Sequence, residues 1–266
     1  MKKFLFIYFT LVLIVFFAPH KALAFDITVG ATSWYVVSEQ YYTQGGAPGV
    51  LHDSLVKSIP ALLYGPTMAV KLNDEFNITF VFLYGNFVTE RDVGNYKFKS
   101  RFTRSDSDLA LNYRLNNYFK VFIGAKYLAY GITPSNTDLS SFMLINRIDD
   151  HASYGSGLGA SCTYPLMGNI FCLGTLSGLY LWGSDKMIVG DKNGNYAQSS
   201  TIGYKEYGVN STLAFAYYIA PASTVISLGG RFQYLIADYK KNPIYLDKIE
   251  FASYGVTLTA TYTFSI

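Results

Sequence analysis

The fold of this chain can be read first from its last residues, Tyr254 to Ile266, which spell "YGVTLTATYTFSI". Every second residue from Tyr254 onward is apolar or aromatic, and the residues between them are glycine, threonine and serine. A period of two places alternate residues on opposite faces of a β-strand. The segment therefore predicts a strand with one apolar face and one face rich in hydroxyl groups.

The other end of the chain predicts export from the cytoplasm. The segment "MKKFLFIYFTLVLIVFFAPHKALA" has two lysines, an apolar run from Phe4 to Ala18, and the small-x-small sequence Ala22-Leu23-Ala24. This is the three-part layout of a secretory signal peptide. The apolar run is shorter than the ~20 residues that a membrane-spanning helix needs. We predict that residues 1–24 are a cleaved signal peptide and that residues 25–266 form a single domain.

Composition narrows the class of that domain. Charged residues make up 15% of the chain, against roughly 25% in soluble domains, whereas half of the residues are hydrophobic and 17% are aromatic. After the signal segment no apolar run approaches the length of a membrane helix, so the hydrophobicity is spread over short alternating pieces. A net charge of +3 is too small to indicate a nucleic-acid partner.

Alternating segments recur along the whole mature chain, and short and long connections alternate between them. This layout predicts an all-β, up-and-down antiparallel meander, with ten strands as the best count against eight or twelve. The predicted strands are 26–37, 60–73, 77–89, 97–114, 118–131, 151–165, 169–183, 203–219, 222–238 and 250–265. The predicted short connections are Asn73–Phe76, Asn116–Asn117, Pro165–Gly168 and Ala220–Ala222.

Strand length separates a membrane barrel from a soluble sandwich, whose strands also alternate. Many segments here exceed ten residues, whereas globular strands most often have about five or six. A tilted strand needs ~9–11 residues to cross the hydrocarbon layer. No water is available there to satisfy an open sheet edge, so the sheet must close. We therefore expect a transmembrane barrel with its apolar face toward lipid and its threonine-glycine face inside.

The chain resembles bacterial outer-membrane β-barrel proteins, a porin-like class, without resembling one subfamily. The resemblance rests on the export segment, the ten alternating segments, the unequal connections and the last strand ending Tyr262-Thr263-Phe264-Ser265-Ile266. Terminal strands in this class often end on phenylalanine, whereas here Phe264 lies two residues before the end. The resemblance implies location in the cell outer membrane, outer-membrane lipid as surroundings, and recognition of the C-terminal strand by the barrel-assembly machinery.

The predicted fourth and fifth strands carry charged residues on their inner faces. Leu109 and Leu111 face out, so Arg104, Asp106 and Asp108 face the lumen. On the next strand the same alternation turns Lys120, Gly124 and Lys126 inward. A connection centred on Asn116 would set Lys126 opposite Asp106, and one centred on Asn117 would set it opposite Asp108. Either register predicts an ion pair inside the barrel.

Two later strands add Glu206, Arg231 and Gln233 to the inner face. Charges in such a lumen need partners or water. Our first interpretation is a scaffold whose lumen is largely filled by an ion network. The first alternative is a narrow channel for small polar solutes, lined or gated by these groups. The second alternative is surface recognition or adhesion through the long loops at 38–59 and 184–202.

An enzymatic interpretation has one pattern to consider. The omptins, ten-stranded outer-membrane proteases, use an Asp-x-Asp pair and an Asp-x-His pair to activate water. Asp106-Ser107-Asp108 and Asp149-Asp150-His151 are similar in spacing. Counting along the strands places the first pair well below the rim and the second near it, so we interpret His151 as a loop-edge histidine. We expect no catalytic activity, no cofactor and no metal site.

Cys162 and Cys172 are the only cysteines and lie symmetrically about Met167, near a predicted tight hairpin. In an exported protein such a pair predicts a disulfide across the hairpin. The seventh segment, "IFCLGTLSGLYLW", is apolar on both faces, so its register stays open. The segment Asp191–Asn195 predicts a hairpin turn rather than a calcium loop, because it lacks the spacing of an EF-hand.

Overall fold

The computed structural model describes residues 26–43, 54–93, 96–134, 146–190, 196–239 and 248–265. Almost all of them lie in strands, and no helix among them is long and apolar enough to cross a membrane. The strands are β1 (Asp26–Thr43), β2 (Ser54–Lys57), β3 (Ala61–Lys71), β4 (Phe76–Val93), β5 (Tyr96–Arg114), β6 (Phe119–Pro134), β7 (Asn146–Met167), β8 (Ile170–Gly190), β9 (Tyr196–Ile219), β10 (Thr224–Asp238) and β11 (Lys248–Ser265), with one 3-10 turn, η1 (Ala220–Ala222).

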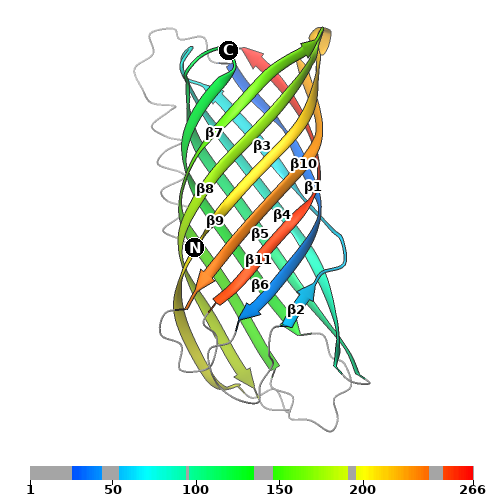
Figure 1. The fold of residues 1–266 in the computed structure, drawn as a ribbon, viewed down its shortest axis with the longest axis vertical. Helices are drawn as coiled ribbons and strands as arrows, with labels where there is room; N and C mark the ends of the chain where they lie inside the picture. The colour runs from blue at the N-terminus through cyan, green and yellow to red at the C-terminus, as the bar shows by residue number, and fades with distance from the viewer. Residues whose placement is uncertain are drawn as a thin grey trace.

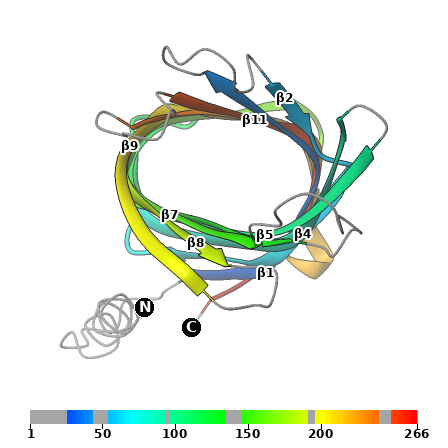
Figure 2. The ribbon, with the colours of Figure 1, turned by 90° about the horizontal axis from the view of Figure 1, so that it is seen from below.

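The strands form one closed antiparallel sheet (Figure 1; Figure 2). Each strand from β3 to β11 pairs with the next, β1 pairs with β3, and β11 pairs with β1, which closes the ring. The short β2 pairs only with β1. The barrel wall therefore has ten strands, and the predicted all-β, up-and-down barrel is confirmed.

The terminal stretch quoted above makes the closing seam. Two threonine pairs face each other across β1 and β11, and their hydroxyl groups hydrogen bond at 2.8 Å between Thr28 and Thr263 and at 2.7 Å between Thr32 and Thr259. Backbone pairing at the seam runs without a shift from Asp26 opposite Ser265 to Thr43 opposite Lys248. The hydroxyl-bearing face of the last strand therefore points inward, where it satisfies its own polar groups at the seam.

Tight turns join the strands at the end of the barrel that holds the C-terminus (Figure 1). Asn73 and Asn116 each accept two backbone N–H bonds, from the residues two and three positions later, at 2.7–2.9 Å. Such side-chain bonds stabilise a turn directly after a strand. The β7–β8 turn uses Gly168 with a φ of +53°, which glycine adopts without strain.

Within the described ranges the wall is interrupted between β2 and β3. Pro60 lies in this break and has no N–H to give to a ladder. On its N-terminal side the bonding is shared between two neighbours. The Ser58 N–H donates to the Ser38 carbonyl and the Ile59 N–H donates to the Val88 carbonyl, both at 2.8 Å. β2 and β3 are therefore two parts of one broken barrel strand.

The face that is apolar changes within single strands. In β11, Leu258 points outward and is 49% exposed, while Thr259 lines the interior. Closer to the other end of the same strand, Phe251 is buried inside and Lys248 is exposed outside. No bulge occurs between these positions. The strand is therefore apolar outside near the short turns and apolar inside near the opposite end.

All sides of the barrel show this inversion. Near the short turns the outer surface exposes large apolar side chains, including Leu111, Ile123, Leu158, Leu176, Leu213 and Leu228. Near the opposite end it exposes charged ones, including Lys57, Arg101, Asp150, Lys186, Lys205 and Lys248. Exposed aromatic side chains lie between the two zones, among them Tyr35, Tyr64, Tyr84, Tyr154, Trp182, Tyr207 and Tyr254. We call the two zones the short-turn half and the loop half.

The two halves suit two solvents. An apolar outer band bounded by aromatic residues is the surface of a barrel in lipid, whereas a polar outside over an apolar inside is the pattern of a protein in water. Strand length agrees, because β7, β8 and β9 have 22, 21 and 24 residues and spanning needs only ~9–11. The short-turn half is the lipid-facing zone, and the loop half extends beyond it.

Several sequence-based boundaries change as a result. The predicted loops at 38–59 and 184–202 both contain strand, because β1 continues to Thr43, β8 to Gly190, and β9 begins at Tyr196. The open register of the seventh segment, now β8, is also settled. Leu179 and Leu181 are buried inside, whereas Tyr180 and Trp182 are exposed outside. The predicted signal segment 1–24 and the turn at Asp191–Asn195 lie outside the described residues and stay predictions.

Candidate functional site

A layer of charged side chains crosses the barrel interior where the inversion occurs. It consists of Arg104, Asp106 and Asp108 from β5, Lys126 from β6, and Arg231 from β10. These positions share the inner face because they lie two residues apart on β5 and follow the same alternation on the other strands. We call this group the charge layer.

The register of β5 and β6 sets the centre of the layer. Lys126 pairs with Asp108, so the connection is centred on Asn117. Its Nζ nevertheless reaches both predicted carboxylates, at 2.5 Å from Asp106 Oδ1 and 2.9 Å from Asp108 Oδ1. The Lys126 and Asp106 side chains are each 1% exposed, whereas that of Asp108 is 33% exposed. One carboxylate is therefore enclosed, and the other reaches open space.

Arg104 is fully buried and connects the layer across the lumen. Its Nη2 donates to Asp106 Oδ2 at 2.9 Å and also to the Gln233 amide oxygen, and its Nη1 donates to Ser253 Oγ at 2.9 Å. The guanidinium lies 5.3 Å from the centre of the Trp34 ring, within the range of a cation–π contact. Side chains from β1, β5, β10 and β11 therefore meet at one point.

Arg231 approaches the same carboxylates from the opposite wall. Its Nη2 lies 3.6 Å from Asp106 Oδ2 and 3.5 Å from Asp108 Oδ2. Its Nε donates to Asn210 Oδ1 at 3.2 Å, and its guanidinium lies 4.6 Å from the Trp34 ring centre. Three cations thus surround two carboxylates, which gives the layer a net charge of +1 from these five groups.

Glu206 lies behind the layer, toward the loop half. It is fully buried, accepts a hydrogen bond from Ser153 Oγ at 2.6 Å, and has Oε1 at 4.0 Å from His151 Nε2. His151 is itself 6% exposed and stacks on Tyr204 with ring centres 4.5 Å apart. The interpretation of His151 as a loop-edge histidine is therefore wrong, because β7 continues past it and turns its ring into the barrel.

Aromatic rings fill the interior of the loop half, and we call this group the plug. The rings of Phe87 and Phe102 stack at 4.8 Å, and Tyr130 stacks on Phe251 at 5.6 Å. His151 and Tyr204 continue the chain of contacts, and leucine side chains pack around it. Close approach to the wall is possible because the Tyr204 ring lies where a side chain at Gly183 would be. The lumen is thus occupied in this half.

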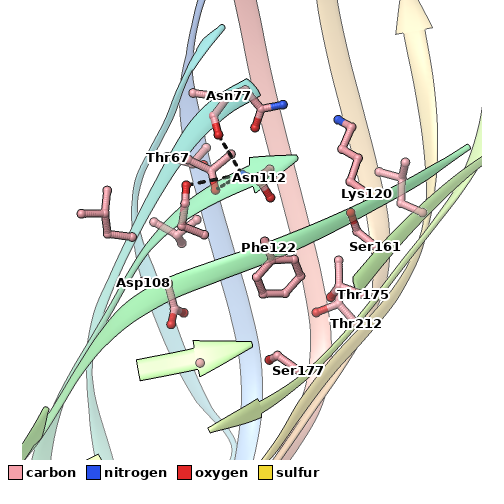
Figure 3. A pocket seen from close by; sticks show the side chains of 18 of the residues that line it. Thr67, Asn77, Asp108, Asn112, Lys120, Phe122, Ser161, Thr175, Ser177 and Thr212 are labelled. Carbon is pink, nitrogen blue, oxygen red and sulfur yellow. Dashed lines mark hydrogen bonds between the residues drawn. The ribbon is translucent and has the colours of Figure 1, made fainter. Parts of the chain in front are cut away.

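The short-turn half contains a cavity of about 760 Å³, which we call the cup (Figure 3). Its wall combines apolar surface with hydroxyl and amide groups, among them those of Thr28, Thr32, Thr67, Thr79, Asn112, Ser161, Thr175, Ser177, Asn210 and Thr212. The charge layer contributes Asp108, Lys126 and Arg231 to its floor. The ring of Phe122 projects into the cup and lies over Gly159, where a Cβ would clash with it.

Charged groups also occupy the end of the cup near the short turns. Lys71 Nζ lies 2.8 Å from Asp74 Oδ1 and 3.8 Å from Asp26 Oδ2. The hydrogen bond from Lys71 holds the pKa of the exposed Asp74 below its usual value. Lys120 lines the wall deeper inside. Among the described residues it has neither an ion pair nor a hydrogen bond, and its partner in the β5 ladder is another cation, Arg114.

The seven predicted lumen residues all face the interior. Arg104, Asp106, Asp108, Lys126 and Arg231 come together in the charge layer, Glu206 lies behind it, and Lys120 stands apart in the cup. Sequence reasoning did not assign Trp34, Ser253, Tyr130 or Tyr204 to this site. The sequence could have indicated them, because each lies two residues from another inward-facing residue on its strand, and residues two apart share a face.

The predicted disulfide does not form, and both cysteines are free. Cys162 lies opposite Gly174 and Cys172 lies opposite Tyr164, so the two are offset by two positions along the ladder. Diagonal neighbours of this kind are ~7–8 Å apart, beyond the usual Cα separation in a disulfide. No group of three or more metal-ligating acidic, histidine or cysteine side chains occurs in the described part of the chain.

Comparisons with known proteins bear on the fold. No protein-family model matches the chain, and no curated protein matches its sequence. Among solved structures, the outer membrane protease OmpT from Escherichia coli has a TM-score of 0.51 and 14% identity, over 93% of this chain and 99% of that one. The outer membrane protein OprG from Pseudomonas aeruginosa has a TM-score of 0.40 and 12% identity, over 92% and 97% of the two chains.

The translocator domain of autotransporter NalP from Neisseria meningitidis also matches, with a TM-score of 0.45 and 12% identity over 96% of this chain and 94% of that one. The likeness to OmpT, at 14% identity, informs the fold and does not indicate a subfamily or an activity. The closed ten-stranded barrel, its apolar outer band and the likeness to OmpT agree with one another. This chain has the fold of a bacterial outer-membrane β-barrel protein.

Proposed function

We propose that the protein is a membrane-spanning scaffold whose lumen is closed, so that it does not conduct ions at rest. The observation that carries this proposal is that two barriers follow one another along the lumen. The charge layer joins β5, β6 and β10 across the interior, and the plug fills the interior beyond it. A ten-stranded barrel has little more internal room than an eight-stranded one, which side chains alone can fill.

Planar bilayer recording tests this closure. Folded protein, identified by a heat-dependent shift in gel migration, should add no stepwise conductance to the bilayer. Replacing both Tyr130 and Phe251 by alanine removes two stacked rings from the plug, and adding Lys126→Ala also removes a side chain from the charge layer. The triple variant, which weakens both barriers, should produce measurable leak. The matched control is Tyr154→Ala, which removes an aromatic ring that is 51% exposed on the outer face. Discrete conductance steps from the folded wild-type protein would refute the closure.

A gated channel for small polar solutes is the second candidate. The cup favours it, because this cavity lies in the short-turn half and ends on the charged groups Asp108, Lys126 and Arg231 of the charge layer. In this case the resting protein would open intermittently, and Lys126→Ala would change the conductance, since Lys126 holds both carboxylates of the layer. Recordings from the wild type and Lys126→Ala therefore separate the two candidates.

We propose no enzymatic role, and the surroundings of His151 support this choice. Its ring contacts Tyr130, Tyr204 and Phe251 inside the plug, and its Nε2 has no hydrogen-bond partner among the described residues. A general base must be able to reach the proton that it removes. Peptide cleavage that is lost on His151→Ala would contradict this proposal. Adhesion through the segments 38–59 and 184–202 stays a prediction, because residues 44–53 and 191–195 within them lie outside the described ranges.

A further inference from the structure

The cup has the properties of a binding site in addition to those of a blocked passage. Its volume of about 760 Å³ falls within the usual ~300–1,000 Å³ of small-molecule sites. The wall supplies many hydroxyl and amide groups at several depths, contributed by strands on all sides of the barrel. Such groups both donate and accept hydrogen bonds, so they match a ligand that carries several hydroxyl groups.

The charges on the lining are unbalanced. The lining holds four cations, Lys71, Lys120, Lys126 and Arg231, and two carboxylates, Asp26 and Asp108. Just outside the lining, Asp74 pairs with Lys71, and Asp106 pairs with Lys126 and Arg231. The carboxylates lie at opposite ends of the cup and already have cationic partners there. Lys120 has no ion pair among the described residues, and Figure 3 shows its side chain well apart from Asp108. An anion would therefore gain a direct partner on the wall, whereas a cation would not.

Arg231 supplies a second, independent indication at the floor. The residue is 9% exposed and lines the cup, yet its Nη2 has no hydrogen-bond partner in the described part of the chain. Its two carboxylate neighbours are at 3.5 and 3.6 Å, beyond the preferred distance for a charge-assisted bond. Buried donors of this kind are normally satisfied by protein, water or ligand. Nη2 itself is buried, so it marks a cation that its protein partners satisfy only in part, and an anion at the floor would complete the surroundings of the Arg231 guanidinium.

We propose that the cup binds a small polyhydroxylated oxyanion, such as a sugar acid or a sugar phosphate, which enters from the short-turn end. Lys120 binds the anionic group, Arg231 adds positive charge at the floor, and the threonine side chains of the wall hydrogen bond to the hydroxyl groups. The direction of access rests on the proposed closure of the loop half, whereas binding itself does not. A conductance result and a binding result can therefore fail independently.

The test is calorimetric titration of the detergent-solubilised, folded protein with four probes of similar size. Glucuronate and glucose 6-phosphate are anionic, glucose is neutral, and glucosamine is cationic. Saturable binding is expected for one or both anions, at least about tenfold tighter than for glucose, because hydrogen bonds to ionised groups are the stronger ones. Tighter binding of glucuronate would identify the ligand as a sugar acid, and tighter binding of glucose 6-phosphate would identify it as a sugar phosphate. No saturable binding of either anion, or equal binding of glucose, would overturn the proposal.

Variants locate the bound anion. Lys120→Met should weaken anion binding about tenfold or more, whereas Lys205→Met, which removes an exposed lysine from the outer face of the loop half, should leave it unchanged. Fluorescence gives a separate readout. With Trp182→Phe as background, Trp34 is the only tryptophan, and it contacts Arg231 at the floor. Equal losses in the two lysine variants, or anion binding without any change in Trp34 emission, would contradict the site.

Discussion

The charge layer depends most strongly on Asp106, and Asp106→Asn is the most informative single change. Asp106 accepts hydrogen bonds from Arg104 Nη2 at 2.9 Å and Lys126 Nζ at 2.5 Å, and Arg231 Nη2 lies 3.6 Å away. Asparagine keeps the shape of the side chain but removes the negative charge. Three cations would then share a single carboxylate, Asp108, in a largely enclosed space.

The expected loss of stability in Asp106→Asn can be worked out from these contacts. Each hydrogen bond to a charged group contributes about 1.5–3 kcal/mol net, and Asp106 accepts two of them. Removing one partner of a buried ion pair costs about 3–5 kcal/mol, because the other charge stays buried without compensation. We therefore expect Asp106→Asn to lower the free energy of unfolding by about 3–5 kcal/mol.

Asp108→Asn is the matched control, since it makes the same chemical change two residues away on the same strand and face. The Asp108 side chain is 33% exposed, so water can replace part of what it loses. Partly exposed ion pairs contribute about 1 kcal/mol or less. The double variant Asp106→Asn with Lys126→Met should be more stable than Asp106→Asn alone, because it also removes one of the uncompensated cations.

Urea unfolding in phospholipid vesicles, followed by tryptophan fluorescence, measures these differences. If Asp106→Asn folds too poorly for an equilibrium measurement, the folded fraction on unheated gels and the rescue by Lys126→Met still report the effect. The reasoning is refuted if Asp106→Asn and Asp108→Asn lower stability by the same amount. It is also refuted if the double variant is less stable than Asp106→Asn.

Three further predictions follow from the fold. Leu158→Lys should lower the free energy of unfolding by about 2–4 kcal/mol, as expected for a lysine facing the bilayer midplane. Ser184→Lys, which is also on the outer face but in the loop half, should change it little. Equal urea midpoints for the two variants would contradict the inversion. Gly183→Val should cost at least about 1–3 kcal/mol in the same assay, because a tyrosine ring occupies the space of the new side chain, and wild-type stability would contradict that packing. Maleimide should label Cys162 and Cys172 in the urea-unfolded protein without prior reduction, and blocked labelling would reveal a disulfide.

The ten strands could be predicted from the sequence because the alternation of apolar and polar side chains reflects a constraint on the backbone. In lipid every strand must alternate and every edge must pair, so short alternating segments with unequal connections leave few topologies. The alternation could not decide the register of the turn at Asn116 and Asn117. A turn centred on either residue keeps the apolar faces of both strands outward, and only the structure showed that it is centred on Asn117.

The misassigned loops and the misplaced His151 share one physical origin, the assumption that a single face is apolar along the whole strand. Phe251 and Leu258 lie on opposite faces of β11, an odd number of residues apart and without a bulge between them. The sequence contains this change, since the apolar positions shift from odd-numbered to even-numbered residues along the strand. However, the residues beyond the lipid-facing zone were interpreted as loop. His151 was misplaced for this reason. The cysteines were misplaced because the hairpin turns at Met167–Ile170, so Met167 is not its centre.

The position of the charge layer follows from the same inversion. An ion network enclosed within the plug would pay a large desolvation cost, and one in open water would gain little from its contacts. At the boundary, Asp106 and Arg104 are enclosed while Asp108 faces the polar cup, so the network can keep water or a polar guest on one side. Because its cations outnumber its carboxylates, that guest should be an anion. The features that close the lumen are thus also the features that give the cup its charge.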